Sequence, residues 1–341
     1  MTSIREVAKL AGVSPATVSR VLNGTAKVDP DKEKRVREVI EATNFVPNEV
    51  ARALFKRSSK IIGVIVPNIE NPFFSQLAHS LESEAYKYGY RIILCNTDEE
   101  HGKAVDSLRM LKRMNADGVI VMNSDEKLTT DLKICQMPVV VMDRQIENME
   151  NVFYISSDHY QGGRLATEHL IECGCKRIVI IKGPQEYSSA KSRFKGYLDV
   201  CEERELAIRT VEGDYSFQAG LKSAEEILKK YPNVDGIIAC NDLVAISVIK
   251  VFFSKGIHVP DNVKLVGFDD IEMSRLIPVE LTTIHQPSDQ MAKKAVELIV
   301  AEAEGKETEE KKYIFPVELV KRHSSADYTF EDFVKMSVKL V

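Results

Sequence analysis

Several features that assign a function at once are absent from this sequence of 341 residues. Its six cysteines form no C-x-x-C pair and have no histidine cluster beside them at zinc spacing, so we expect buried free thiols rather than a zinc site or a redox motif. No apolar run approaches the roughly 18 residues that a membrane-spanning helix requires. No signal peptide is recognisable either, since the first residues form an amphipathic helix. These absences predict a cytoplasmic protein with no membrane partner.

Motifs of the common enzyme classes are missing as well. No G-x-S-x-G, P-loop or G-x-G-x-x-G follows any of the apolar runs. Asp269 and Asp270 could act as paired acids, or scattered Ser, His and Asp residues could assemble into a triad. Asp269 is better explained as an acceptor for a hydroxyl group. The sequence therefore predicts a protein that is not an enzyme and that needs neither a cofactor nor a metal.

The chain as a whole lacks the excess of positive charge that is typical of nucleic-acid-binding proteins. Its net charge is −5. The charge is unevenly distributed, because residues 1–60 contain 12 Lys and Arg against 7 Asp and Glu, whereas the remainder contains 34 against 44. A basic head on an acidic body indicates that only the head meets phosphates.

The stretch from Val7 to Gly24 has the pattern of two short helices joined by a tight turn. Gly12 stands where the turn needs a positive φ, Ser14 can cap the second helix, and Pro15 takes its first position. With Val18 and either Val21 or Leu22 facing inward, the outer face carries Pro15, Ala16, Thr17, Ser19 and Arg20. Such a face fits a DNA major groove, where Arg can pair with guanine and an alanine methyl can touch thymine. An ordinary helical hairpin with a polar face is the alternative interpretation.

Two further segments complete the N-terminal part. Residues 31–43 predict a third helix with an apolar stripe of Val36, Val39 and Ile40. After Pro47, a helix of about two turns over residues 49–55 is too short to be stable alone in water, so we expect it to order on a partner. Leu54 on this helix has the character of an apolar wedge for a minor groove. A plain interdomain linker is the alternative.

From Lys60 onward, apolar runs alternate with helical stretches. The runs are Ile61–Val66, Arg91–Cys95, Gly118–Met122, Val139–Met142, Arg177–Ile181, Gly236–Cys240 and Lys264–Phe268. The helical stretches are Phe74–Tyr88, Gly102–Met114, Tyr160–Cys173, Lys191–Arg204, Phe217–Lys230, Asp242–Lys255 and Asp289–Glu304. This alternation indicates parallel sheets covered by helices, and two such sets, before and after about Ser157, indicate two similar lobes.

Polar and aromatic residues follow nearly every run. Because ligands of open α/β sheets bind beyond the carboxyl ends of the strands, these positions are the informative ones. They hold carboxylates, amides, arginines and aromatic rings, at 68–74, 143–145, 192–197, 213–215, 241–242, 269–270 and 285–287. A sugar site requires this combination, since hydroxyls donate to carboxylates and accept from Arg or Asn while aromatic faces cover C–H patches. Taken singly, each charged residue could instead belong to a surface ion pair.

Residues 2–58 resemble the DNA-binding head and hinge of the lactose-repressor family of bacterial transcription regulators. The matching segments are IREVAKLAGVSPATVSRVLNG, FVPN and VARALFKRSS. In that family the second helix reads the major groove and paired hinge helices kink the operator. The resemblance implies base reading by Pro15, Ala16 and Arg20, phosphate-side positions for Thr17, Ser19 and Asn23, and a wedge at Leu54. Phe55 departs from the family, whose members usually carry a polar residue there.

Residues 61–322 resemble periplasmic sugar-binding proteins, those for ribose above all, and PVELVKRHSS resembles the end of ribose operon repressors. The shared motifs are NPFF, DRQ, ND and GFDD. The resemblance implies effector contacts at Asn71, Phe73, Phe74, Asp143, Arg144, Arg193, Asn241, Asp269 and Gln286, and at Tyr215, which replaces a phenylalanine. The pair Asp143-Arg144 together with Gln286 is the more selective signal.

The expected fold class is a small all-α helix-turn-helix head plus a hinge helix, joined to an α/β body like that of periplasmic binding proteins, with two doubly wound parallel-sheet lobes. The head spans residues 1–46, the hinge 47–59 and the body 60–325. We expect the first lobe at about 60–157 and 287–316 and the second at about 158–286 and 317–325. The tail, 326–341, looks like a short amphipathic helix.

The resemblance implies a transcriptional repressor that binds a pseudo-palindromic operator as a homodimer and is released by a sugar, ribose in the first place. Lobe closure around the sugar would separate and melt the hinge helices. The lack of a heptad tail favours a dimer over a tetramer. The alternative is a carbon-catabolite-control regulator activated by a phosphorylated phosphocarrier protein, although such regulators generally lack the pair at Asp143-Arg144. The head and the missing signal peptide disfavour a secreted sugar-binding protein.

Overall fold

The computed structural model describes residues 2–24, 26–45, 58–122, 128–133, 135–143, 152–306 and 308–326. The chain divides into two compact units, a head at 1–59 and a body at 60–341, and each is described by itself. The predicted hinge helix with Leu54, the effector residue Arg144 and nearly all of the tail lie outside the described residues.

The head consists of three helices, α1 (Ile4–Ala11), α2 (Pro15–Asn23) and α3 (Pro30–Thr43). The turn between α1 and α2 forms as expected, since Gly12 has φ +64° and the Ser14 side chain accepts a hydrogen bond from the Thr17 backbone N–H. Val18 faces inward into a small apolar core made by Val7, Ala8, Ala11, Val18, Val36 and Phe45. The helix-turn-helix geometry therefore follows from local capping and from one apolar stripe on each helix, of which Val18 in α2 and Val36 in α3 are buried.

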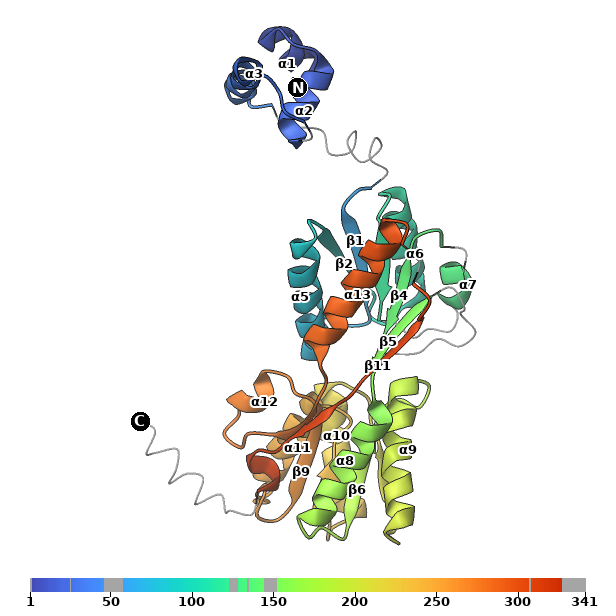
Figure 1. The fold of residues 1–341 in the computed structure, drawn as a ribbon. Helices are drawn as coiled ribbons and strands as arrows, with labels where there is room; N and C mark the ends of the chain where they lie inside the picture. Colours follow the sequence, from blue (N-terminus) through green and yellow to red (C-terminus); the bar gives the residue numbers. More distant parts are fainter. Residues whose placement is uncertain are drawn as a thin grey trace. The chain divides into compact units, whose positions relative to one another are not determined.

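The first sheet of the body has six strands in the order β11-β5-β4-β3-β1-β2. They are β1 (Ile61–Val66), β2 (Arg91–Asn96), β3 (Gly118–Val121), β4 (Val139–Met142), β5 (Phe153–Ser157) and β11 (Lys312–Phe315), all paired in parallel. On one face lie α5 (Pro72–Lys87) and α13 (Ser288–Ala303), and on the other α6 (His101–Arg113) and α7 (Leu128–Lys133). Figure 1 shows helices on both faces of this sheet, which explains why its central strands are buried.

The second sheet has the order β12-β10-β9-β8-β6-β7. Its strands are β6 (Ile178–Lys182), β7 (Thr210–Glu212), β8 (Gly236–Ile238), β9 (Lys264–Asp269), β10 (Thr282–His285) and β12 (Glu318–Val320), and only the β10–β12 pair is antiparallel. Helices α8 (His159–Glu172) and α9 (Ser188–Glu203) cover one face, and α10 (Phe217–Lys230) and α11 (Asp242–Ser254) the other. The short helix α12 (Met273–Leu276) lies between β9 and β10 in the chain, and η1 (His323–Ser325) follows β12.

The chain passes between the two sheets three times, after β5, after β10 and between β11 and β12 (Figure 1). We call the part built on the first sheet lobe 1 and the part built on the second sheet lobe 2. The carboxyl ends of β4 and β9 carry Asp143 and Asp269, both with left-handed backbone angles, at φ +67° and +113°. Non-glycine residues seldom adopt such angles, and where they do the surrounding structure must hold them.

The structure confirms the predicted fold class, a helical head followed by an α/β body with two mostly parallel sheets. Each of the seven apolar runs contains a strand, and a last short strand ends at His285 as expected. Strands β5, β7, β11 and β12 were not predicted. All six cysteines are free, as expected, and four of them are buried, whereas Cys135 and Cys173 are half-buried. Within the residues that the structure describes, no helix is long and apolar enough to cross a membrane.

Candidate functional site: a DNA-facing helix and an interlobe cleft

The outer face of α2 is short and polar. Pro15, Ala16 and Arg20 are exposed there, whereas Thr17 and Ser19 are half-buried. Thr17 also stabilises the turn, because its Oγ1 lies 3.0 Å from Ser14 Oγ and its N–H donates to that oxygen. The predicted base-reading residues are thus the accessible ones, and Asn23 ends the helix with its side chain outside the described set.

A shallow hollow lies beside this helix, at the turn that precedes it. It is lined by Ala8, Lys9, Gly12, Val13, Ser14, Thr17 and Lys32. The two lysines place positive charge next to the N-terminus of α2, whose own dipole also favours an anion. Neither lysine was among the DNA contacts predicted from the sequence. Their position fits contact with the backbone of a nucleic acid.

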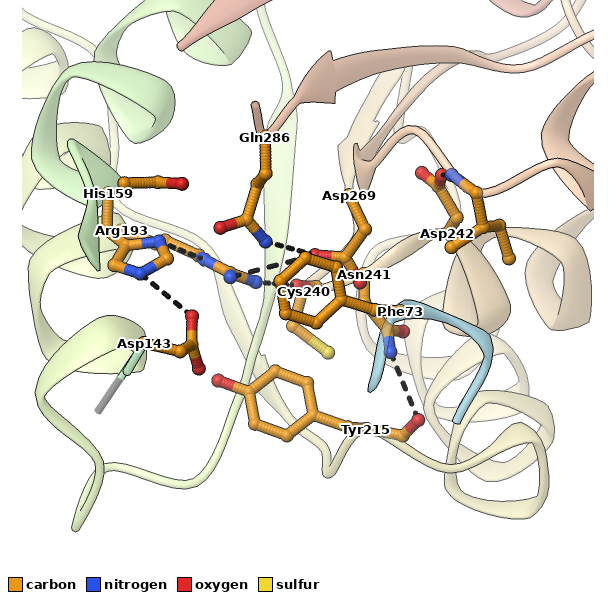
Figure 2. A network of polar contacts seen from close by, with 12 residues as sticks. Phe73, Asp143, His159, Arg193, Tyr215, Cys240, Asn241, Asp242, Asp269 and Gln286 are labelled. Atoms are coloured by element: carbon orange, nitrogen blue, oxygen red, sulfur yellow. Dashed lines mark hydrogen bonds and ion pairs between the residues drawn. The ribbon is translucent and has the colours of Figure 1, made fainter. Parts of the chain in front are cut away.

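In the body, a chain of buried polar side chains begins at Gln286. Gln286 Nε2 donates to Asp269 Oδ1 at 2.7 Å, and Arg193 Nη2 lies 3.8 Å from the same oxygen (Figure 2). Arg193 Nη1 donates to the Cys240 carbonyl at 2.6 Å, and its guanidinium lies 3.6 Å from the centroid of the Phe268 ring. Gln286, Asp269 and Arg193 are all buried. The arginine is therefore fixed on several sides, as required of a group that must present its charge in one direction.

The chain continues across to lobe 1. Arg193 Nε donates to His159 Nδ1 at 3.3 Å, and His159 Nε2 lies 3.1 Å from Asp143 Oδ1 (Figure 2). Asp143 directly follows β4 of lobe 1, whereas His159 begins α8 and Arg193 lies on α9, both of lobe 2. One continuous polar path thus joins the strand ends of the two sheets.

Asn241 and Tyr215 lie at the same edge of lobe 2. The Asn241 side chain caps α11 by accepting from the Val244 N–H at 2.9 Å, and its amide donates to the Tyr215 carbonyl at 3.1 Å (Figure 2). The Tyr215 ring stacks on Tyr187 with a centroid separation of 6.4 Å. Tyr187 in turn donates from its hydroxyl to Glu99 Oε2 of lobe 1 at 2.7 Å, which is a second interlobe link.

Asn71, Phe73 and Phe74 begin α5 in lobe 1. Asn71 caps the helix, accepting from the Phe73 N–H at 3.1 Å, and the two phenylalanine rings meet edge to face at 5.4 Å. A cleft of about 570 Å³ separates the lobes here. It is lined from lobe 1 by Asn68, Glu70, Asn71, Phe74, Asp98 and Glu99 and from lobe 2 by Pro184, Asp214, Tyr215, Ser216, Phe217, Gln218 and Leu243. Its volume suits a small molecule.

Two buried groups of this site have displaced pKa values. Burial raises the pKa of Asp269 to about 7, although the nearby Arg193 charge and the Gln286 hydrogen bond act in the opposite direction. Burial lowers the pKa of His159 below 6.5, and Arg193 lowers it further, while Asp143 opposes both. A carboxylate that is costly to ionise when buried is stabilised by any added donor, such as a hydroxyl group.

Of the ten predicted effector residues, Figure 2 shows seven close together, namely Phe73, Asp143, Arg193, Tyr215, Asn241, Asp269 and Gln286. Asn71 and Phe74 line the cleft together with Tyr215, and Arg144 lies outside the described residues. Sequence reasoning missed His159 and Tyr187, and it placed Asp242 at a strand end without giving it a role. Buried Asp242 accepts from the Thr283 hydroxyl at 2.5 Å and from the Ile271 N–H at 2.9 Å, which holds the turn after Asp269. Among the described residues, no cluster of His, Cys, Asp and Glu could hold a metal ion.

Comparison with known proteins agrees with this geometry. "Periplasmic binding proteins and sugar binding domain of LacI family" describes residues 59–323, and "Bacterial regulatory proteins, lacI family" describes residues 3–48. The chain is 38% identical over 325 residues to a ribose operon repressor of Halalkalibacterium halodurans, covering 95% of this chain and 97% of that protein. It is 35% identical over 347 residues to the HTH-type transcriptional repressor PurR of Haemophilus influenzae, covering 100% of both.

A solved structure extends the likeness to the body. The LacI family transcriptional regulator from Enterococcus faecium with bound ribose has a TM-score of 0.71 and 28% identity, covering 79% of this chain and 100% of that chain. Together with the helix-turn-helix head and the two-lobed body, these findings show that the chain belongs to the lacI family of bacterial regulatory proteins and is a DNA-binding transcriptional repressor with a sugar-binding domain.

Proposed function

We propose that this repressor takes ribose as its effector and that ribose releases it from operator DNA. The observation that carries the proposal is the buried polar chain at the strand ends. Among the described residues Gln286 Oε1 has no hydrogen-bond partner although the side chain is 1% exposed, and Asp269 beside it is buried. Buried polar groups without partners are costly, so the site is incomplete until a ligand supplies donors.

A small polyol supplies what these groups need. Its hydroxyls would donate to Asp269, Asp143 and Gln286 Oε1 and accept from Arg193, while Phe73 and Phe74 cover C–H surface. The ribose operon repressor at 38% identity and the ribose-bound family member favour a pentose within this class. Asn71, Arg144, Tyr215 and Asn241 complete the set of effector contacts in this proposal.

The coupling to DNA would run through the lobes. An effector that contacts both Asp143 in lobe 1 and Asp269 in lobe 2 binds more tightly when the lobes are closed than when they are open. This difference in affinity between the two arrangements is what shifts the equilibrium from open to closed lobes. In a dimer, closure moves the two first lobes relative to each other and melts the hinge helices around Leu54. By reciprocity, operator DNA weakens effector binding by the same factor.

A homodimer fits the surface of lobe 1. Strand β2 is the edge of its sheet, with Leu94 38% exposed, and Tyr86 and Tyr88 at the end of α5 are also exposed. An exposed apolar edge strand is a natural place for a second chain to pair. Two heads would then contact a pseudo-palindromic operator, with Pro15, Ala16 and Arg20 on base edges and Thr17, Ser19 and Asn23 on phosphates.

Isothermal titration calorimetry with the full-length protein tests the effector. We expect heat of binding with D-ribose and none with glucose, fructose, hypoxanthine or guanine. Heat with another compound and none with ribose would reject ribose and leave the repressor assignment in place. A gel shift that shows no loss of operator binding with any sugar, but a gain with a phosphorylated phosphocarrier protein, would favour the carbon-catabolite-control alternative.

A further inference from the structure

His159 is the residue through which lobe 1 and lobe 2 meet inside the site. It is 4% exposed, it is the first residue of α8, and its ring lies 5.8 Å from the Phe268 ring, centroid to centroid. Its two ring nitrogens face different partners, Arg193 of lobe 2 and Asp143 of lobe 1 (Figure 2).

The partners determine where the imidazole proton is. Arg193 has only N–H donors, so Nδ1 of His159 must accept and carries no proton. The proton of the neutral ring is therefore on Nε2, which lies 3.1 Å from the Asp143 carboxylate. The ring is held as one tautomer that accepts a hydrogen bond from lobe 2 and places its N–H within ion-pair distance of the Asp143 carboxylate of lobe 1. A second proton would set two donors, His159 Nδ1–H and Arg193 Nε–H, against each other.

The other groups around the ring do not change this assignment. The charged groups within contact are Asp143 at the end of β4 and Arg193 on α9. A pocket of about 150 Å³ also borders the ring, and its titratable lining residues are Tyr154 of β5, Asp158 and Tyr160 at the start of α8, and Lys312 of β11. Burial and Arg193 lower the pKa of His159, which agrees with a neutral ring.

We propose that His159 is a positioning residue of the effector site: the neutral Nε2–H tautomer ties Arg193 to Asp143, so that adding a proton to the ring displaces Arg193 and weakens effector binding. This inference rests on the proposed function, since it takes Arg193 and Asp143 as effector contacts. Asp269, with its pKa of about 7, lies 3.8 Å from Arg193 and also makes the site depend on pH, so the contribution of His159 is measured against variants that keep Asp269.

Two near-isosteric variants separate the two contacts. In His159→Asn the side-chain oxygen can take the place of Nδ1 and accept from Arg193, whereas Asp143 loses its donor. In His159→Gln the amide nitrogen can take the place of Nε2 and donate to Asp143, whereas Arg193 loses its acceptor. Neither variant can be protonated. Each should bind D-ribose about 3- to 10-fold more weakly than wild type at pH 7.5, the effect of one hydrogen bond.

The decisive readout is the pH profile, which a merely structural role would not move. Calorimetry with D-ribose from pH 7.5 downwards should show wild type losing several-fold more affinity than either variant once the pH falls below the pKa of the His159 ring, with the ratio rising towards lower pH. Equal profiles for wild type and both variants would overturn the proposal. Thermal unfolding without ligand identifies a variant that fails to fold, and the other variant then decides.

A second measurement is independent of ribose. Long-range ¹H–¹⁵N spectra of the full-length protein, with the His159 signals assigned by their loss in His159→Asn, should show the Nε2–H tautomer at pH 7 and protonation of the ring only below its ordinary pKa of 6.5. An Nδ1–H tautomer, or titration at the ordinary pKa of 6.5, would overturn the proposal. If wild type binds no ribose at any pH, the ribose assignment fails while this spectrum still decides the state of His159.

Discussion

Asp269→Asn should make the ligand-free protein more stable at alkaline pH and at the same time abolish its response to ribose. Asp269 is buried, and its pKa is raised from 3.8 to about 7. The folded state therefore holds a proton that the unfolded state has lost between these two pH values. Stability from this group is present in full below 3.8, declines as pH rises, and reaches its lowest level above about 7.

The magnitude follows from the pKa displacement. At about 1.4 kcal/mol per unit, the ionised carboxylate costs up to about 4 kcal/mol at pH 8 and less than about 2 kcal/mol at pH 5. Asparagine is neutral at both values, can still accept from Gln286 Nε2, and tolerates a positive φ about as well as aspartate does. The variant should therefore exceed wild type in stability at pH 8 by up to that amount, and by less than half of it at pH 5.

Urea unfolding of the full-length protein at both pH values measures this difference. Asp261→Asn is a matched control, because it removes the same charge from an exposed position of lobe 2. D-ribose at saturation should raise the unfolding midpoint of wild type and of the control, and leave that of Asp269→Asn unchanged. A variant that is no more stable than wild type at pH 8, or a difference that does not shrink at pH 5, would refute the reasoning.

Three further substitutions test other parts of the account. Gly163→Ala should destabilise lobe 2 by about 1–3 kcal/mol or more in urea unfolding, because an added Cβ would lie 2.1 Å from the Arg193 carbonyl oxygen where α8 and α9 cross. Gly174→Ala is the control: an added Cβ there meets nothing within 4 Å, but φ is +85°, so this variant measures the cost of backbone strain alone. Arg20→Ala should weaken operator binding in a fluorescence-anisotropy titration by about 1–3 kcal/mol and relax the preference at one base pair; loss that is uniform across operator sequences would instead make Arg20 a phosphate contact. Tyr187→Phe removes the hydroxyl that donates to Glu99 and should lower ribose affinity about 10-fold in calorimetry; unchanged affinity would mean that this link does not favour the closed lobes.

Most of the body could be predicted because its strands are continuous apolar runs. Ile61–Val66 and Val139–Met142 are buried between two helical layers, and such runs are recognisable without knowledge of their partners. Strand β5 (Phe153–Ser157) is short and ends in two serines, and β11 alternates exposed and half-buried residues. They pair with each other although more than 150 residues of sequence separate them, and nothing local indicates that pairing.

The site residues likewise divide into those that follow a recognisable strand and those that do not. Asp143, Asn241 and Asp269 were predicted because each directly follows an apolar run. His159 follows β5, and because that short strand does not stand out in the sequence, no strand end was predicted before His159. The hydrogen bonds from Thr283 and from the Ile271 N–H to Asp242 join distant segments, so sequence reasoning had no means to find how the turn after Asp269 is held.

In the proposed mechanism, a sugar in the cleft weakens the binding of the head to DNA. Fluorescence anisotropy with a labelled operator, selected from random duplexes by the full-length protein, measures this coupling directly. Saturating D-ribose should raise the Kd for that operator by about 5- to 150-fold, the usual range of coupling between two sites. An operator Kd that is the same in saturating ribose and in its absence would contradict the account.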